Sequence, residues 1–245
     1  MNLFGLTDIG LVRKSNQDSY AIRVLDDKLA VAVVCDGMGG AQAGNVASAV
    51  AVEAFSAAME GFCKDGIPPD AERKQELLRA ACRAANTRVF ELAQNNPEYE
   101  GMGTTLVAAL ILSHEVYVAN IGDSRCYIWA EGELKQVTSD HSLVQALVDI
   151  GDITPEEAKT HPKKNLITRA LGIEESVVCD IFQIERKAGS ILLLCSDGMS
   201  NVVADETIEH ELSICTAPQV TAAALLAHAV EHGAPDNVTI ITGCL

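Results

Sequence analysis

The chain has 245 residues, of which 34 are Asp or Glu and 18 are Lys or Arg, so its formal net charge is −16. This acidic balance argues against non-specific binding to nucleic acid, which depends on Lys and Arg that neutralise phosphates, and anionic membrane surfaces would repel the chain. Hydrophobic residues make up 48% of the sequence, enough for a soluble protein with a large buried core.

The first part of the chain predicts strands followed by two long helices. Short apolar runs bounded by Gly, Asp or Asn are typical of strands, and they occur at residues 2–9, 18–25 and 28–35. Alanine-rich stretches at 41–60 and 70–95 carry apolar residues at helical spacing. Asp70 stands at the expected N-terminus of the second helix, where a carboxylate is favoured.

The rest of the chain predicts further strands, one irregular region and a last helix. The strands are expected at 104–113, 115–121, 124–130, 177–185, 190–195 and 237–244. A helix is expected at 218–232, and short helical pieces at 142–150 and 155–160 lie within an irregular region at 139–172. An insertion of this kind between core strands is either a functional, mobile segment or a plain surface connection.

The grouping of the predicted strands indicates the fold class. Because the strands follow one another in groups and do not alternate strictly with helices, a doubly wound parallel sheet is disfavoured. We therefore expect an α+β fold in which two antiparallel sheets pack together and are flanked by helices. The sequence shows no internal repeat or low-complexity linker, so one domain is expected over residues 1–245.

The apolar runs and the cysteines predict a soluble, cytoplasmic protein. Runs such as 29–35, 105–112 and 191–195 are far shorter than the roughly 20 residues of a membrane span. The first residues lack the basic segment and long apolar core of a signal peptide. The eight cysteines form no C-x-x-C pair, which favours buried free thiols in a reducing compartment over a disulfide framework or a zinc site.

Aspartates stand at the ends of several predicted strands. Asp36, Asp123 and Asp197 closely follow apolar runs, and Asp236 precedes the last strand. Any one of them, beside Gly or Asn, is explained by turn chemistry. Together they suggest carboxylates that converge at one edge of a sandwich, where mutual repulsion keeps some of them protonated unless a cation binds. Such oxygen-rich sites suit Mg²⁺ or Mn²⁺, and the glycine at position 37 allows a main-chain carbonyl to join them.

Metals held by carboxylates, without a cluster of His or Cys, point to phosphate chemistry. Two such cations can generate a hydroxide nucleophile and clamp the oxygens of an in-line displacement. In the segment 10–18, Arg13 offers a planar guanidinium that can bind phosphate, and Asp18 adds a fifth acid. The plain alternative for Arg13 is an ordinary surface arginine. Ser124 and Ser196 are expected to hydrogen-bond to the acids beside them.

These residues resemble the motifs of the metal-dependent Ser/Thr protein phosphatase family (type 2C), in its bacterial form. The motifs follow the family's order along the chain: Arg13-x-x-Asn16-Gln17-Asp18, Asp36-Gly37-Met38-Gly39-Gly40, Gly103-Thr104-Thr105, Gly122-Asp123-Ser124-Arg125, Asp140-His141-Ser142, Leu166-Ile167-Thr168-Arg169-Ala170-Leu171-Gly172, Ser196-Asp197-Gly198 and Asp236-Asn237. Each motif is weak alone, and the ordered set is specific. The resemblance implies a four-layer αββα sandwich with a metal centre in a cleft at one edge of the sheets.

The resemblance also implies how two Mn²⁺ or Mg²⁺ ions are held. Asp36 is expected to bridge the two ions, and the carbonyl of Gly37 to bind the second one. Asp197 and Asp236 are expected to complete the first site. Asp18 is expected to act largely through metal-bound water.

Further roles follow from the same resemblance. Asp123, together with Asp197, matches a third and weaker metal site of bacterial relatives, and Arg13 is expected to hold the substrate phosphate. The region 139–172 corresponds to the flap beside the cleft. Met38 stands where eukaryotic relatives have a His that is proposed to protonate the leaving group, and a thioether cannot donate a proton. His141 is better explained as structural than as a replacement.

The predicted function is hydrolysis of phosphoserine and phosphothreonine in proteins by direct attack of a metal-bridging hydroxide, with Asp36 and Arg13 as catalytic residues. We expect a cytoplasmic monomer that opposes a eukaryotic-like Ser/Thr kinase and acts on its phosphorylated substrates. No nucleic-acid or membrane partner is expected. One alternative is a phosphatase dedicated to a single regulator, such as a phosphorylated anti-sigma-factor antagonist. The other is a catalytically silent domain that binds metals or phosphoproteins.

Overall fold

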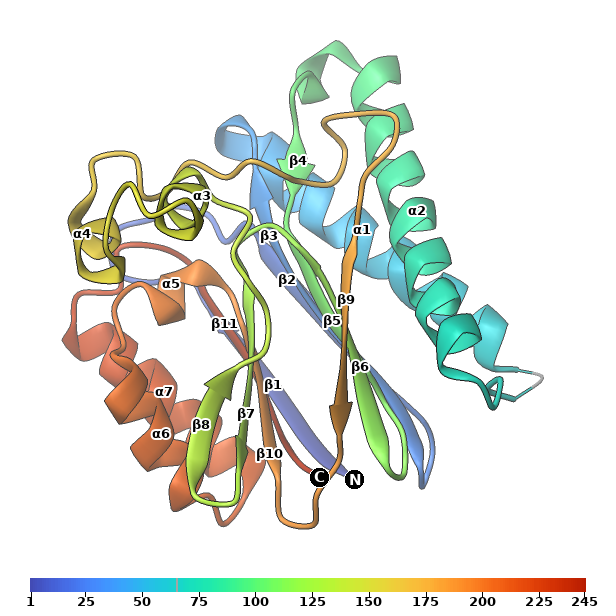
Figure 1. Cartoon of the computed structure of the whole chain (residues 1–245). Helices are drawn as coiled ribbons and strands as arrows, with labels where there is room; N and C mark the ends of the chain where they lie inside the picture. The colour runs from blue at the N-terminus through green and yellow to red at the C-terminus, as the bar shows by residue number, and fades with distance from the viewer. Residues whose placement is uncertain (65) are drawn as a thin grey trace.

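The computed structural model describes residues 1–64 and 66–245, and their side chains except at 41 and 42. Two antiparallel sheets pack face to face, and helices cover the outer face of each sheet (Figure 1). The expected α+β fold, with two antiparallel sheets flanked by helices in four layers, is therefore confirmed. The N- and C-termini lie close together at the lower edge in Figure 1.

The first sheet has the strand order β1-β11-β10-β7-β8. Its strands are β1 (Asn2–Asp8), β7 (Arg125–Ala130), β8 (Glu133–Gln136), β10 (Ile191–Cys195) and β11 (Val238–Cys244). Two helices cover its outer face, α6 (Asp205–Ser213) and α7 (Pro218–Glu231). Leu212, Leu225 and Ile240 meet in the core between these helices and the sheet.

The second sheet has the order β2-β3-β5-β6-β9, and a short strand β4 also pairs with β3. Its strands are β2 (Asp18–Asp26), β3 (Leu29–Met38), β4 (Gly103–Thr104), β5 (Leu106–Ile111), β6 (Glu115–Ile121) and β9 (Asp180–Glu185). The long helices α1 (Gly40–Cys63) and α2 (Ala71–Asn95) cover its outer face. Asp70 caps α2 by accepting a hydrogen bond from the Arg73 N–H, as its position predicts.

Strand β3 shows why the sandwich forms. Alternate side chains of a strand point to opposite faces, so Val31 and Val33 pack under the helices while Ala32 and Val34 pack against the other sheet. Burying a valine completely is worth roughly 1.5–3 kcal/mol. A continuous apolar run therefore suits a central strand that is covered on both faces, and it ends where the chain reaches the edge of the sheets.

The region 139–172 crosses the upper edge of the two sheets in Figure 1 and carries two short helices. These are α3 (Leu143–Asp149) and α4 (Pro155–Thr160), close to the predicted bounds. Ser142 caps α3, and Thr154 with Glu157 forms a capping box at the start of α4. Local capping thus fixes both helices although neither has a fully buried residue.

Some elements differ from the predicted ones. The expected strand at 104–113 is divided, because Thr105 turns its N–H to the Asp36 carbonyl and separates β4 from β5. The prediction missed β8 and α6, as well as α5 (Asp197–Ser200) and the single 3₁₀ turn η1 (Pro97–Tyr99). Their sequences are short or rich in polar residues, so their apolar periodicity is weak.

One helix corrects the expectation that no segment approaches the length of a membrane span. Within α1, Ala43–Cys63 is long and apolar enough by length and composition alone. It packs on the second sheet and beside α2, and core helices of soluble proteins meet the same test. All eight cysteines are free, as predicted, and half of them are buried.

Candidate metal and phosphate site

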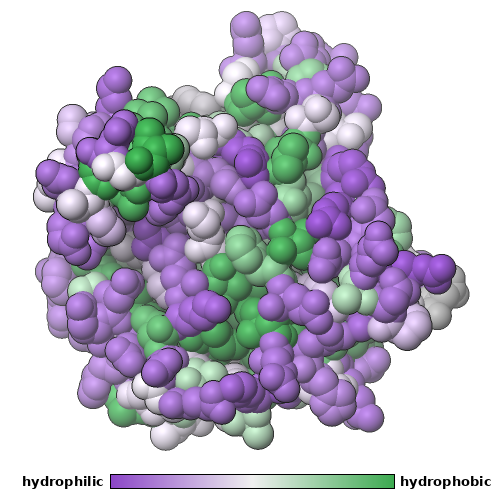
Figure 2. Space-filling model, viewed as in Figure 1, coloured by the Kyte–Doolittle hydropathy of each residue, from purple (hydrophilic) through white to green (hydrophobic). Residues whose placement is uncertain are grey.

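The predicted acids come together at the upper edge of the sandwich in Figure 1. A cavity of about 470 Å³ opens there between the ends of the two sheets. Most of the predicted site residues line it, namely Arg13, Asp36, Gly37, Asp123, Asp197 and Asp236. Asp18 is only 8% exposed and lies beneath them. Figure 2 shows mainly hydrophilic residues over the surface, with hydrophobic residues gathered between the two sheets and in a smaller group at the upper left.

Strand pairing places the first two acids opposite each other. Asp18 begins β2 and is the register partner of Asp36 near the end of β3. Thr105 fixes the backbone of Asp36, because its Oγ1 accepts from the Asp36 N–H at 2.9 Å and its own N–H donates to the Asp36 carbonyl at 2.8 Å. The Asp36 side chain therefore projects from a backbone that is held on two sides.

Glycine is required at position 37 by the neighbouring backbone. A Cβ at Gly37 would lie 1.9 Å from the carbonyl oxygen of Gly44, in the first turns of α1. The Gly37 N–H donates to the Gln17 carbonyl at 3.0 Å. This close approach of β2, β3 and α1 is what brings the Gly37 backbone to the wall of the cavity.

Asp197 begins α5 directly after β10. Its Oδ2 accepts from Asn201 Nδ2 at 2.9 Å, whereas its buried Oδ1 has no partner among the described residues. The neighbouring Ser196 donates to Asp18 Oδ2 at 2.7 Å, and Asp18 Oδ1 is also buried without a partner. Ser196 thus bonds to the acid across the sheets and not to the acid beside it, which corrects that prediction. Ser124 likewise bonds to Thr105.

Asn237 joins the last acid to the N-terminal segment. Its side chain accepts from the Gln17 N–H at 2.8 Å and donates to the carbonyls of Ile9 and Ser15. Arg13, on the same segment, donates from Nη2 to Asp236 Oδ2 at 2.6 Å. The Arg13 side chain is 50% exposed and lines the cavity. The sequence analysis identified the motif Asp236-Asn237, but it could not predict that Asn237 binds the N-terminal segment.

The acids repel one another strongly. Burial, with smaller effects from Asp197 and Asp236, raises the pKa of Asp18 to about 6. Burial and the neighbouring acids also raise the pKa of Asp36 well above its ordinary value. Burial, then Asp197 and Asp140, raises the pKa of Asp123 to about 8. Burial and Asp236 raise the pKa of Asp197. A bound divalent cation removes the free-energy cost of keeping several charged carboxylates close together in a buried site.

Within residues 1–64 and 66–245, no three His, Cys, Asp or Glu side chains already stand in a metal-binding arrangement. Three of the acids have other partners: Asp236 accepts from Arg13, Asp197 from Asn201 and Asp18 from Ser196. The donor set nevertheless fits hard divalent cations. It consists of carboxylate oxygens, two of them buried and without partners, beside the Gly37 backbone.

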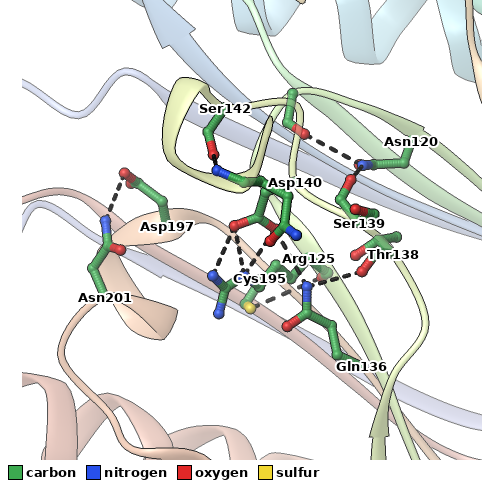
Figure 3. A network of polar contacts seen from close by, with 12 residues as sticks. Asn120, Arg125, Gln136, Thr138, Ser139, Asp140, Ser142, Cys195, Asp197 and Asn201 are labelled. Carbon is green, nitrogen blue, oxygen red and sulfur yellow. Dashed lines mark hydrogen bonds and ion pairs between the residues drawn. The ribbon is translucent and has the colours of Figure 1, made fainter. Parts of the chain in front are cut away.

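Asp123 lies between the cavity and the region 139–172. Asp123 and Asp197 also line a second cavity, of about 490 Å³, which lies beneath α3 and α4. Arg125 and Asp140 also line this cavity and face each other in Figure 3, joined by bonds of 2.9 Å from Nε and 2.7 Å from Nη2. Asn120 donates to the Ser139 carbonyl at 3.0 Å and to the Gly122 carbonyl at 3.3 Å. This network ties the turn at Asp123 to the start of the region 139–172.

The described residues that line the first cavity include Met38 but no histidine. His141 is largely buried beside the Asp123 turn, and its Nδ1 accepts from the Gly122 N–H at 3.0 Å. Its Nε2 lies 3.1 Å from Asp180 Oδ2. Burial lowers the pKa of His141. These contacts agree with its interpretation as a structural residue.

The chain is similar along most of its length to known protein phosphatases. A sequence model of the protein phosphatase 2C family matches residues 12–230. The serine/threonine phosphatase stp of Listeria welshimeri is 37% identical over 235 residues, which are 96% of this chain and 92% of that protein. The serine/threonine protein phosphatase PstP of Mycobacterium tuberculosis is 44% identical over 239 residues, which span 43% of its length.

Solved structures agree with these sequence relatives. The crystal structure of the Mycobacterium tuberculosis phosphatase PstP/Ppp superposes with a TM-score of 0.88 at 40% identity, and covers 100% of this chain and 98% of that one. The catalytic domain of PstP in complex with two manganese ions has a TM-score of 0.83 at 39% identity, and covers 98% of this chain and 96% of that one.

Proposed function

We propose a metal-assisted hydrolysis for this chain, which belongs to the protein phosphatase 2C family and is a protein serine/threonine phosphatase. In this proposal it removes phosphate from phosphoserine and phosphothreonine in proteins. The single observation that carries the proposal is the convergence of four aspartates at one cavity with Asp18 beneath them, where one buried carboxylate oxygen of Asp18 and one of Asp197 have no partner among the described residues. Phosphatases of this family use divalent metal ions, and such ions would neutralise these carboxylates.

The proposed ligands follow from the placement of the acids. Asp36 and the Gly37 carbonyl would share the pair of Mn²⁺ or Mg²⁺ ions, with Asp197 and Asp236 completing the first site. Asp18 lies beneath the cavity wall, which supports a contact through water and not a direct bond. A manganese-bound relative supports two ions.

A third ion is proposed at Asp123. This acid lines both cavities together with Asp197, and burial, followed by repulsion from Asp197, raises the pKa of Asp123. A cation there would sit beside the region 139–172, which we propose to be the flap of a single catalytic domain over residues 1–245.

When bound, two such cations would lower the pKa of a water molecule and supply a hydroxide for direct in-line attack on phosphorus, without a phosphoenzyme. Arg13 would bind the phosphoryl oxygens with its planar guanidinium. Arg13 uses Nη2 for its bond to Asp236, so its other N–H groups would face the phosphoryl oxygens.

The leaving alkoxide needs a proton from a source other than position 38. Met38 lines the cavity, and its thioether cannot act as a general acid. General acid catalysis is typically worth about 10²–10⁴-fold, so its absence lowers the rate and does not prevent hydrolysis. We propose that water in the cavity supplies this proton.

We propose that the chain acts in the cytoplasm as a monomer and opposes a eukaryotic-like Ser/Thr kinase. A phosphatase dedicated to one phosphorylated regulator remains the alternative. A panel of unrelated phosphopeptides separates the two, because turnover of most of them supports a broad role and turnover of one supports the narrow role.

The proposal is tested by hydrolysis of p-nitrophenyl phosphate and a phosphothreonine peptide with Mn²⁺, Mg²⁺ and Ca²⁺ in parallel. Replacing a charged ligand weakens the metal site, so Asp36→Asn should lower kcat/KM by at least about 10²-fold. Asp27→Asn, on an exposed turn, is the matched control and should keep full activity. Full activity of Asp36→Asn, or of the wild type in saturating chelator, would refute the mechanism. Metal binding without any hydrolysis would indicate the catalytically silent alternative.

A further inference from the structure

Two cysteines that are 97 residues apart in sequence meet where α2 packs against the segment leading into β9. The Sγ atoms of Cys82 and Cys179 lie 3.4 Å apart. Cys82 is completely buried on the inner face of α2, and Cys179, next to the first residue of β9, is partly exposed. Cys179 packs against the same core but is partly exposed, so it is the residue of the pair nearer to solvent, and the buried Cys82 thiol lies behind it.

The segment that carries Cys179 is fixed to α2 at a second point. We call residues 172–179 the return limb, because they lead from the region 139–172 back into β9. Asn86 lies one helical turn beyond Cys82 and is 1% exposed. Its Nδ2 donates to the carbonyls of Glu174 and Glu175, both at 3.0 Å, and its Oδ1 accepts from the Gly172 N–H at 2.9 Å. These bonds hold the two thiols close together.

The return limb connects directly to the site. Leu171, the residue before it, exchanges two backbone hydrogen bonds with Thr104, at 2.8 and 3.1 Å. Thr104 Oγ1 in turn donates to the Asp36 carbonyl at 2.8 Å. At the other end, Asp180 accepts from Arg169 at 2.8 Å. These bonds connect the return limb to the backbone that carries Asp36, so a movement of the limb relative to α2 would be transmitted along them.

We propose that Cys82 and Cys179 are a reversible disulfide site, which peroxides oxidise and cellular thiols reduce, and that its oxidation slows the enzyme. The Cys179 thiolate attacks the peroxide oxygen, the O–O bond breaks, and a sulfenic acid and hydroxide form. The Cys82 thiolate then attacks the Cys179 sulfur and displaces a second hydroxide as the S–S bond forms. In total two thiols are oxidised to one disulfide, and with their two protons hydrogen peroxide is reduced to two waters.

The order of the two steps follows from the surroundings of each thiol. The contact with Cys179 and burial both raise the pKa of Cys82, so it is a poor first nucleophile toward a solute. In the second step its target is already in contact, which compensates for a small thiolate fraction. Bond formation must draw the sulfur atoms from 3.4 Å to about 2.05 Å, which pulls the return limb toward α2.

A second pair of cysteines provides an internal comparison. The Sγ atoms of Cys215 and Cys244 lie 3.8 Å apart, where the segment after α6 meets the end of β11 in the first sheet. Both residues are partly exposed. This pair is farther apart and has no connection to Asp36 among the contacts described above. Replacing Cys215 is therefore a matched control for replacing Cys179.

The test uses the full chain loaded with Mg²⁺, treated with hydrogen peroxide, blocked with an alkylating reagent and mapped as non-reduced peptides. We expect a cross-linked peptide that joins Cys82 to Cys179, with loss of two hydrogen atoms. It should be present in Cys215→Ala, absent in Cys82→Ala and Cys179→Ala, and removed by dithiothreitol. Because the bond closes a long loop, the melting temperature should rise by roughly 5 °C or more. The kcat for a phosphopeptide should fall at least twofold and recover on reduction.

The wild-type peptide map decides the first half of the proposal even if the cysteine variants fold poorly. Overoxidation of Cys179 without a cross-link to Cys82 would overturn it, as would a cross-link only between Cys215 and Cys244. A Cys82–Cys179 cross-link that forms equally well in urea would also overturn it, because the pairing would not depend on the fold. A cross-link in the folded enzyme with unchanged kcat would overturn the proposed effect on the enzyme.

Discussion

At the scale of single residues, the site is a set of carboxylates in an unfavourable environment. Asp18 and Asp197 each keep one buried oxygen without a hydrogen-bond partner among the described residues, and a buried unpaired acceptor costs about 1–3 kcal/mol. Arg13 is the cation bonded to Asp236, and it is half exposed. These carboxylates thus lower the stability of the fold at the place where we propose that cations bind.

Arg13 provides a prediction at this scale. Its exposed pair with Asp236 contributes little to folding, so Arg13→Ala should change the free energy of unfolding by less than about 1 kcal/mol. Loss of a charged, forked donor to phosphate should lower kcat/KM for a phosphopeptide by roughly 10–100-fold. Arg13→Lys should recover only part of this loss, because it keeps the charge without the fork.

Steady-state kinetics and chemical denaturation check this prediction in parallel. Arg23→Ala is the control, because Arg23 forms an exposed ion pair with Glu60 on the outer side of β2 and α1. An equal loss of kcat/KM in both variants would contradict a specific role of Arg13 in phosphate binding.

At the scale of elements, the site depends on the close approach of β3 to the start of α1. The chain leaves β3 at Met38, turns through Gly39 with a φ of 119°, and enters α1 at Gly40. The absence of a Cβ at Gly37 lets the Gly44 carbonyl come close to β3. The start of α1 therefore packs directly on the Gly37 backbone, and β4 pairs with the same residue through Thr104.

Gly37→Ala tests this packing. Its methyl group would lie 1.9 Å from the Gly44 carbonyl oxygen, so β3 and α1 must separate. We expect a loss of about 2 kcal/mol or more in the free energy of unfolding, and a clear rise in the Mn²⁺ concentration needed for half-maximal activity. Urea denaturation and metal titration measure the two effects.

Gly61→Ala is the matched control within α1. A Cβ at Gly61 meets nothing within 4 Å, so alanine should stabilise the helix by roughly 0.5–1 kcal/mol and leave the metal titration unchanged. If the two variants behaved alike, close packing at Gly37 would not be the cause of the effect.

At the scale of the whole molecule, the acids link stability to pH and metal. Burial and like charges raise the pKa of Asp18 to about 6 and that of Asp123 to about 8. With a raised pKa, the folded chain keeps protons that the unfolded chain has already released. The stability of the metal-free protein is therefore lost as the pH rises from the ordinary aspartate range toward 8.

We expect the melting temperature in chelator to fall by roughly 5–10 °C between pH 5 and pH 8. Saturating Mn²⁺ should raise the melting temperature and reduce its dependence on pH, because the cation takes the place of the protons on the carboxylates. Asp123→Asn should make the slope in chelator shallower. Differential scanning calorimetry measures all three curves, and parallel curves with and without Mn²⁺ would contradict the link.

The sequence by itself determined the fold class, most elements and the identity of the acids. Apolar runs such as 29–35 indicate central strands because side chains on both faces must be buried, and this dependence is local in sequence. The sequence could not predict β8 or α6, because these elements are stabilised by the tertiary neighbours that they pack against. It also could not show that Ser196 bonds to Asp18 and not to Asp197.

Only the tertiary structure decided how the acids meet and what holds them. The register of β2 with β3 sets Asp18 opposite Asp36, and Asn237 joins the N-terminal segment to β11. Such contacts join residues far apart in sequence, and one residue of slippage would turn each side chain to the other face of its sheet. The net charge of −16 therefore indicated little about function, whereas the folded positions of five aspartates determine the proposed chemistry.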